Sequence, residues 1–374
     1  MRLGVVDVGS NTVRLMVADG AGTVPLPVHT AKRRLRLAEH IDGSGRISGE
    51  AVTLLADAVA AARQEAERWG VTAPFVFATS IVRDAPNRQD VLAAVLRRTG
   101  MPLRLMSGGT EAELTFLAAR RWMGWRSGPL VLLDIGGGSL EVAFGRSGMP
   151  DFAASLPLGA GRLTREHFGR DDPPGPPAVR ELRRRVRHEL RDVAARIRWE
   201  GPRTGVATSR TFQQLARLCG AAPGREGPFV QRGLARRDLR PAIEALAALP
   251  TDQRASMPGI SRARAGQSLA GALVAHTTMK LIGLDRVVIS PWALREGILL
   301  TYLEGGEVAW WTPPTDAPHG AAPHAVAGSA GAVPAGWAPV EAEPAHTTPA
   351  EEAPDAAGRP REEPGAGRVA VRTG

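Results

Sequence analysis

The residues best suited to chemistry lie in a glycine-rich turn between two apolar stretches. Residues 130–145 read LVLLDIGGGSLEVAFG, which predicts a strand that ends at Asp134, a tight turn and a second strand. The turn consists of three glycines and one hydroxyl residue: Gly136, Gly137, Gly138 and Ser139. Glycines allow backbone N–H groups to surround a phosphate, and Asp134 is suited to bind the Mg²⁺ that accompanies phosphate oxygens. A tight hairpin without a ligand is the structural alternative.

The same unit occurs a second time near the start of the chain. Residues 5–17, VVDVGSNTVRLMV, align with residues 132–144, LLDIGGGSLEVAF, without a gap and at an offset of 127 residues. Asp7 therefore aligns with Asp134, and Arg14 aligns with Glu141. A repeated strand, turn and strand predicts two similar domains that present their turns to a shared cleft. This pattern resembles the superfamily of actin, sugar kinases and heat-shock chaperones.

Two further charged residues are placed for phosphate chemistry. A buried strand over 75–78 is predicted to end in a loop that holds Arg83, and open α/β sheets bind ligands at the carboxyl ends of their strands. We therefore favour Arg83 as a phosphate clamp over a surface ion pair. Glu111 lies in the first turn of a helix predicted to follow Gly108, where an acid compensates the helix dipole. Spacing alone favours that ordinary role for Glu111.

The composition indicates a soluble protein of two domains. The 374 residues leave room for two cores, and a hydrophobic content of 43% is typical of globular proteins. No apolar run approaches the ~20 residues of a membrane span, so no membrane partner is expected. The single cysteine, Cys219, excludes an internal disulfide and favours a cytoplasmic location.

The charge is distributed unevenly along the chain. Residues 1–306 carry 43 basic and 29 acidic side chains, which suits a polyanion such as nucleic acid, a nucleotide or chained phosphate. A codon-driven arginine surplus explains the same charge. The helix predicted over 179–197 has a basic face that either solvent or a polyanion would cover: Arg183, Arg184, Arg187 and Arg191. Residues 307–374 hold nine acidic and four basic side chains among Ala, Gly and Pro, and we predict that they are disordered.

Six motifs in order give residues 1–304 a specific resemblance. They are DVGSNT (7–12), ATSIVRDA (78–85), SGGTEA (107–112), DIGGGSLEV (134–142), SLPLGAGRLT (155–164) and PWALREGIL (291–299). The chain resembles the exopolyphosphatase and guanosine pentaphosphate phosphohydrolase family in its short two-domain form. Members cleave the terminal phosphoanhydride of polyphosphate, or the 5′ γ-phosphate of guanosine pentaphosphate, with Mg²⁺.

The resemblance implies roles for individual residues. Glu111 matches the family's catalytic glutamate, a base that deprotonates water for attack on the terminal phosphorus. Asp134 and Glu141 match its metal ligands, Asp7 faces them from the other domain, and Glu111 and Asp134 are the expected catalytic residues. The phosphoryl oxygens would be held by the amides of 136–139, Ser10, Asn11 and Arg83.

Two departures from the family pattern keep other functions open. Thr110 stands where most relatives have a second acid, and the loop 205–211 is bulkier than theirs, with Arg210 added. Polyphosphate hydrolysis is the leading hypothesis. Hydrolysis of guanosine pentaphosphate or a nucleoside triphosphate, and a sensor that binds without turnover, are the alternatives. Nucleic acid is disfavoured as a partner, and a homodimer is left open.

The expected fold is α/β, with two ribonuclease H-like domains of the actin-like superfamily and a cleft between them. The expected N-terminal domain is 1–120, the C-terminal domain is 121–306, and the disordered tail is 307–374.

Overall fold

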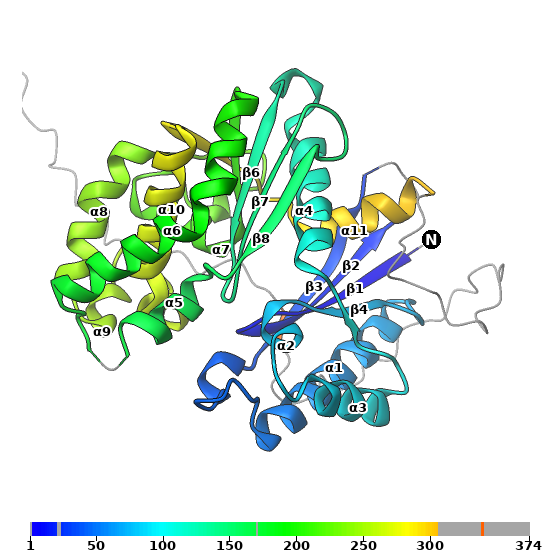
Figure 1. The fold of residues 1–374 in the computed structure, drawn as a ribbon. Helices are drawn as coiled ribbons and strands as arrows, with labels where there is room; N and C mark the ends of the chain where they lie inside the picture. The colour runs from blue at the N-terminus through cyan, green and yellow to red at the C-terminus, as the bar shows by residue number, and fades with distance from the viewer. Residues whose placement is uncertain (1, 21–23, 170, 306–337, 340–374) are drawn as a thin grey trace, which may run out of the picture. The chain divides into compact units, whose positions relative to one another are not determined.

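The computed structural model describes residues 2–20, 24–169, 171–305 and 338–339, which contain two six-stranded sheets (Figure 1). The first sheet has the order β12-β3-β2-β1-β4-β5. Its strands are β1 (Arg2–Val8), β2 (Thr12–Asp19), β3 (Leu26–Arg34), β4 (Phe75–Ala78), β5 (Arg104–Leu105) and β12 (Ala338–Pro339). The apolar strand β1 pairs antiparallel with β2 and parallel with β4, so it lies in the middle of the sheet.

The second sheet has the order β8-β7-β6-β9-β11-β10, in which the first five strands correspond to β3-β2-β1-β4-β5 of the first sheet. Its strands are β6 (Leu130–Ile135), β7 (Leu140–Gly145), β8 (Phe152–Leu156), β9 (Thr204–Thr208), β10 (Gly233–Ala235) and β11 (Arg286–Ile289). Here β6 pairs antiparallel with β7 and parallel with β9, as β1 does with β2 and β4. The predicted fold class, α/β with two ribonuclease H-like domains, is confirmed.

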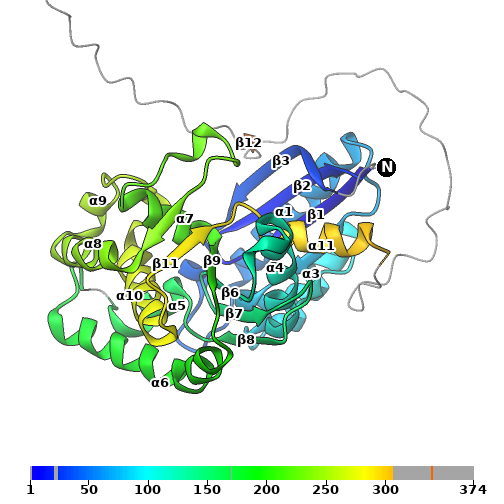
Figure 2. The same cartoon turned by 90° about the horizontal axis from the view of Figure 1, so that it is seen from above.

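Helices cover one face of each sheet through apolar side chains. On the first sheet these are α1 (Gly49–Arg68) and α3 (Arg88–Thr99), and α1 begins where the Ser48 hydroxyl accepts a hydrogen bond from the Ala51 N–H. On the second sheet they are α5 (Ala160–His167), α6 (Pro176–Glu200), α7 (Ser209–Leu218), α8 (Arg236–Ala248) and α10 (Ala265–Ile282). Two further helices are single turns, α2 (Ser80–Arg83) and α9 (Thr251–Arg254). Figure 2 shows α6, α8 and α10 together, away from α1 and α3.

Two helices connect the sheets on their other faces. The helix α4 (Gly108–Met123) packs Phe116 and Ala119 against β6 and β7 of the second sheet. The last long helix, α11 (Leu294–Leu303), packs Ile298 and Leu299 against β1 and β4 of the first sheet. The two helices also touch each other, because a Cβ on Gly297 would lie only 2.0 Å from the Leu114 carbonyl oxygen. Both sheets lie in one compact unit.

The domain boundaries at 120/121 and 306/307 stay predictions. Most of the tail predicted to be disordered, 307–374, lies outside the described residues. Its described part is β12, in which Ala338 pairs with Lys32 of β3. Among the described helices, none has the length and apolarity needed to span a membrane.

Candidate active site

The two repeated hairpins close with the same backbone hydrogen bond. The Gly9 N–H donates to the Thr12 carbonyl oxygen at 3.0 Å, and the Gly136 N–H donates to the Ser139 carbonyl oxygen at 2.9 Å. The strand, tight turn and strand predicted from the sequence are therefore present in both halves of the repeat.

Glycines allow the turns to approach one another closely. A Cβ on Gly137 would lie 2.0 Å from Ser10 Oγ and 3.9 Å from Asn11 Nδ2. A Cβ on Gly138 would lie 2.4 Å from Ser80 Oγ. Any side chain at either glycine would displace these neighbours, so the close approach depends on glycine. The structure thus brings the predicted phosphate residues Ser10 and Asn11 next to the second turn.

Four carboxyl groups lie near one another, because the charges of Glu141, Asp134 and Asp7 all affect the pKa of Glu111. Burial, followed by the charge of Glu141, raises the pKa of Glu111 well above its ordinary value, and Asp134 and Asp7 add to the rise. Burial also raises the pKa of Asp134 to about 6, with a smaller rise from Asp7, and the pKa of Glu141 to about 7, with a further rise from Asp134. The pKa of Asp7 is raised by burial, and the charges of Arg295 and Arg14 oppose that rise.

Neighbouring strands hold two of these carboxylates in place. Thr208, at the carboxyl end of β9, donates a hydrogen bond to Asp134 Oδ2. Ser155 of β8 donates to Glu141 Oε1 at 2.8 Å, and only 2% of Glu141 is exposed. Asp134 and Glu141 face each other in register across β6 and β7. Their separation is therefore fixed by the hairpin itself.

Arg83 and Glu111 meet directly. Arg83 Nη1 lies 3.3 Å from Glu111 Oε2 and donates to the Met106 carbonyl oxygen at 2.9 Å. The expected loop around Arg83 is wrong, because residues 80–83 form the single turn α2. The Ser107 hydroxyl accepts the Thr110 N–H and caps α4, so capping does not require Glu111. The Glu111 carboxylate is directed to Arg83 and the other carboxylates instead.

Sequence reasoning missed three arginines around the carboxylates. Burial lowers the pKa of Arg14 and of Arg264 to about 10, and neighbouring arginines lower both further, which shows that several cations are crowded here. Arg295 opposes the rise in the pKa of Asp7. Two of these arginines could have been found from the sequence: Arg14 aligns with Glu141 in the repeat, and Arg295 lies in the motif PWALREGIL (291–299). Arg264 precedes α10 with no local pattern that marks it.

The donor set fits a hard divalent cation. Within the described ranges, no three His, Cys, Asp or Glu side chains converge closely enough to hold a metal ion by themselves. Mg²⁺ is commonly held by one or two carboxylates, with phosphate oxygens and water completing its shell. Burial raises the pKa values of the Asp134 and Glu141 carboxylates even though arginines lie nearby, and a bound cation would favour their ionised forms further.

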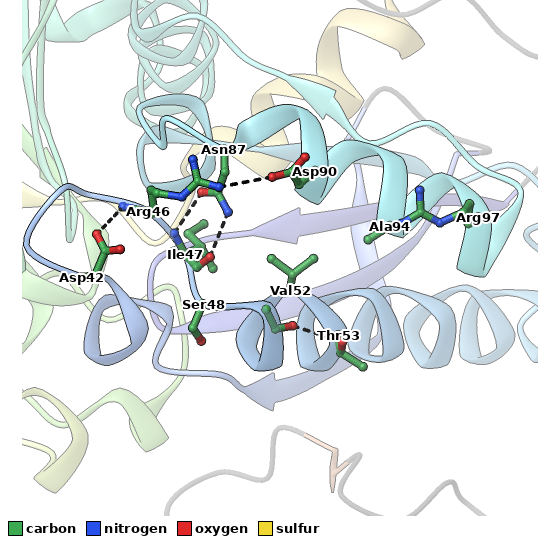
Figure 3. Close-up of a pocket in the computed structure, with 11 residues that line it drawn as sticks. Asp42, Arg46, Ile47, Ser48, Val52, Thr53, Asn87, Asp90, Ala94 and Arg97 are labelled. Carbon is green, nitrogen blue, oxygen red and sulfur yellow. Dashed lines mark hydrogen bonds and ion pairs between the residues drawn. The ribbon is translucent and has the colours of Figure 1, made fainter.

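A pocket of about 420 Å³ lies elsewhere, between α1, α3 and the loop before α1 (Figure 3). The Asn87 side chain accepts the Ile47 N–H at 3.0 Å and donates to the Ile47 carbonyl oxygen at 2.9 Å. Arg46 pairs with Asp90 at 3.6 Å across the same pocket. None of the predicted site residues lines it, and these contacts attach the loop to α3.

Comparison with known proteins agrees with this architecture. The model of the Ppx/GppA phosphatase family matches residues 16–305. An uncharacterized protein of Streptomyces coelicolor is 65% identical over 83% of this chain and 93% of its own, and Exopolyphosphatase 1 of Mycobacterium leprae is 46% identical over 81% and 90%. The crystal structure of an exopolyphosphatase from Cytophaga hutchinsonii has the same fold, with a TM-score of 0.75 at 23% identity over 82% of this chain and 99% of that one. The chain therefore belongs to the Ppx/GppA phosphatase family.

Proposed function

We propose that this chain is an exopolyphosphatase, which hydrolyses the terminal phosphoanhydride of inorganic polyphosphate and releases phosphate. The observation that supports this most strongly is the convergence of acidic and basic side chains on two touching glycine turns. Exopolyphosphatase is also the name of relatives that are 46% identical to the chain. We expect the enzyme to work in the cytoplasm, since its one cysteine indicates a reducing compartment.

Glu111 acts as the general base in this proposal. Because its pKa is raised, the Glu111 carboxylate is a stronger base than an ordinary glutamate and accepts a proton from water more readily. Arg83 holds one carboxylate oxygen at 3.3 Å, so the side chain has a fixed orientation. Water placed by Glu111 would attack the terminal phosphorus in line with the leaving oxygen.

Charge neutralisation is the second part of the mechanism. Asp134, Glu141 and Asp7 are the candidate ligands of Mg²⁺, of which one or two would hold the ion together with phosphate oxygens and water. The ion would neutralise charge on the phosphate oxygens when it is bound. Thr208 and Ser155 keep the first two carboxylates in position through hydrogen bonds.

The phosphate chain itself would be bound by fixed donors. The amides of 136–139, Ser10 and Asn11 surround the terminal phosphoryl group, and Arg83 lies beside them. The arginines at the edge of the site, Arg14 and Arg264, supply positive charge for the following phosphates.

The test of this proposal is a comparison of substrates with purified protein. We expect kcat/KM for phosphate release to be higher on long-chain polyphosphate than on guanosine pentaphosphate or ATP. A higher value on guanosine pentaphosphate would assign the pentaphosphate hydrolase activity instead. Binding of polyphosphate without phosphate release under any divalent metal would identify a sensor and contradict the proposal.

A further inference from the structure

A strongly basic cavity lies away from the carboxylates, among α6, α8, α10 and the start of β11. Its volume is about 900 Å³, within the size range of small-molecule sites. Seven cationic side chains and one carboxylate line it: Arg183, Arg187, Arg236, Arg237, Arg240, Lys280, Arg286 and Asp285. None of the residues assigned to the active site is among its lining residues.

The cavity and the active site occupy opposite ends of the second sheet. Thr208, at the carboxyl end of β9, contacts Asp134, whereas Arg286 begins the parallel strand β11. Arg264 precedes α10 and belongs to the active site, while Lys280 is in the last turn of that helix. At 1.5 Å per residue, the 16 residue steps from Arg264 to Lys280 span about 24 Å. One short phosphate chain bound at the carboxylates would not fill this cavity.

The cations that face the cavity differ from others on the same helix. Arg184 pairs with Glu181 at 2.7 Å, and Arg185 pairs with Glu189 at 3.1 Å. Arg183 and Arg187, one turn apart on α6, have no carboxylate partner among the described residues. Like charges at this spacing destabilise a helix. An anion in the cavity would remove that cost.

The local field is positive throughout the cavity. His276, which also lines it, has a pKa lowered by burial and then by the charges of Arg183, Arg236, Lys280 and Arg240. Arg236 and Arg237 lie in the first turn of α8, where the helix dipole adds to their charge instead of opposing it. Three of the lining arginines have a carboxylate partner: Arg236 pairs with Asp285 at 2.6 Å, Arg237 with Asp238 at 3.5 Å and Arg240 with Glu244 at 3.6 Å. The positive charge that these carboxylates do not offset comes mainly from Arg183, Arg187 and Lys280.

We propose that this cavity is a second anion site, which binds a condensed phosphate chain outside the active site. Arginine forks match phosphate oxygens, and a concave site suits a compact anion better than a nucleic acid duplex. No Phe, Tyr or Trp side chain lines the cavity, so it lacks the large aromatic surfaces on which bases usually stack. The choice of condensed phosphate over other compact polyanions rests on the proposed function.

Titration calorimetry with tripolyphosphate in EDTA tests this site. The test variant is Arg183→Gln/Arg187→Gln/Lys280→Gln, and the matched control is Arg184→Gln/Arg185→Gln/Arg196→Gln, which removes the same charge from residues paired with glutamates. We expect the control to bind as many tripolyphosphate molecules per chain as the native protein, and the test variant to bind one fewer. Equal numbers in both variants would overturn the proposal. Both variants keep the active site, so any tripolyphosphate bound there is the same in both. The expected difference in the number of bound molecules therefore does not depend on whether the chain is an exopolyphosphatase.

A second measurement uses the native protein, so it tests the site even if the test variant does not fold. It also distinguishes between possible ligands. In the native protein, tripolyphosphate should raise the pKa of the His276 imidazole, because the anion neutralises the facing arginines and Lys280. The His276 titration is measured by NMR. An unchanged His276 titration would overturn the proposal. If ATP binds as tightly as tripolyphosphate, the cavity is a nucleotide site. If the test variant loses DNA binding but not tripolyphosphate binding, the cavity is part of a nucleic-acid surface. Either result contradicts a condensed-phosphate site.

Discussion

The pKa of Glu111, which pairs with Arg83, is subject to opposing electrostatic effects. Burial and the other carboxylates raise the pKa of Glu111, whereas Arg83 lowers it. The neighbouring acid Glu113 is exposed on the same helix and has no such surroundings. Two glutamates two residues apart therefore have different chemistry, because the helix turns one toward the site and the other toward solvent.

Replacing Glu111 with Gln should lower phosphate release from polyphosphate by at least ~100-fold, the effect of losing a general base. Glutamine keeps the size of the side chain, so unfolding in urea should change little. Glu113→Gln is the matched control and should retain native turnover. Native turnover in a folded Glu111→Gln protein would refute the assignment of the base.

The pH profile provides a second test at the same residue. A base must be ionised, so kcat/KM should rise with pH through the raised pKa of Glu111. Arg83→Gln removes the charge that lowers this pKa, and the acidic limb should therefore move to higher pH. Arg98→Gln, which removes the 2.7 Å pair with Asp57 away from the site, is the control and should leave the limb in place. A limb that stays in place or moves to lower pH in Arg83→Gln would contradict the electrostatic account.

Among the elements, the start of α5 sets the position of the second turn. The Ala160 N–H donates to the Gly136 carbonyl oxygen at 3.0 Å, and Arg162 N–H donates to that of Gly137 at 2.9 Å. A Cβ on Gly159 would lie 2.3 Å from the Gly138 carbonyl carbon. The start of α5 is thus packed directly on the backbone of the turn.

Gly159→Ala should consequently destabilise the protein and weaken phosphate binding. Overpacking against backbone typically costs about 1–3 kcal/mol, which urea unfolding would measure. KM for polyphosphate should rise in the same variant because the turn is displaced. Gly148→Ala, where an added Cβ meets nothing within 4 Å, is the control. An unchanged midpoint and KM in Gly159→Ala would show that the turn tolerates the displacement.

The hairpins were predictable from sequence because their information is local. Apolar runs, an aspartate and glycines at a fixed offset define both, and their strands pair Asp134 with Glu141 in register. The environment of these carboxylates was less predictable. Thr208 and Arg264 reach Asp134 from segments more than 70 residues away, and their positions depend on strand order and helix packing that no local pattern encodes.

For the whole molecule, the buried carboxylates link stability to pH and to metal. The pKa of Asp134 rises from 3.8 to about 6 on folding, and that of Glu141 from 4.5 to about 7. The folded state therefore binds more protons than the unfolded state between these values, so the metal-free protein should lose stability as pH rises through them.

Mg²⁺ should accordingly raise Tm more at pH 8 than at pH 5, because it replaces the protons that the carboxylates lose. Differential scanning calorimetry with and without EDTA measures the two shifts. Asp134→Asn should reduce the shift at pH 8, whereas Asp151→Asn, which lies outside the site and pairs with Arg146, should keep it. An equal shift at both pH values would contradict this linkage.

Arg14 in the first copy of the repeat and Glu141 in the second copy occupy equivalent positions. Five strands of each sheet have the same order, and the register that places Glu141 opposite Asp134 places Arg14 opposite Asp7. The two copies of the repeat therefore have opposite charges at one equivalent position, a carboxylate at Glu141 and a guanidinium at Arg14. If both copies descend from one ancestral hairpin, a single change of side chain was enough to make two structurally equivalent positions electrostatically different.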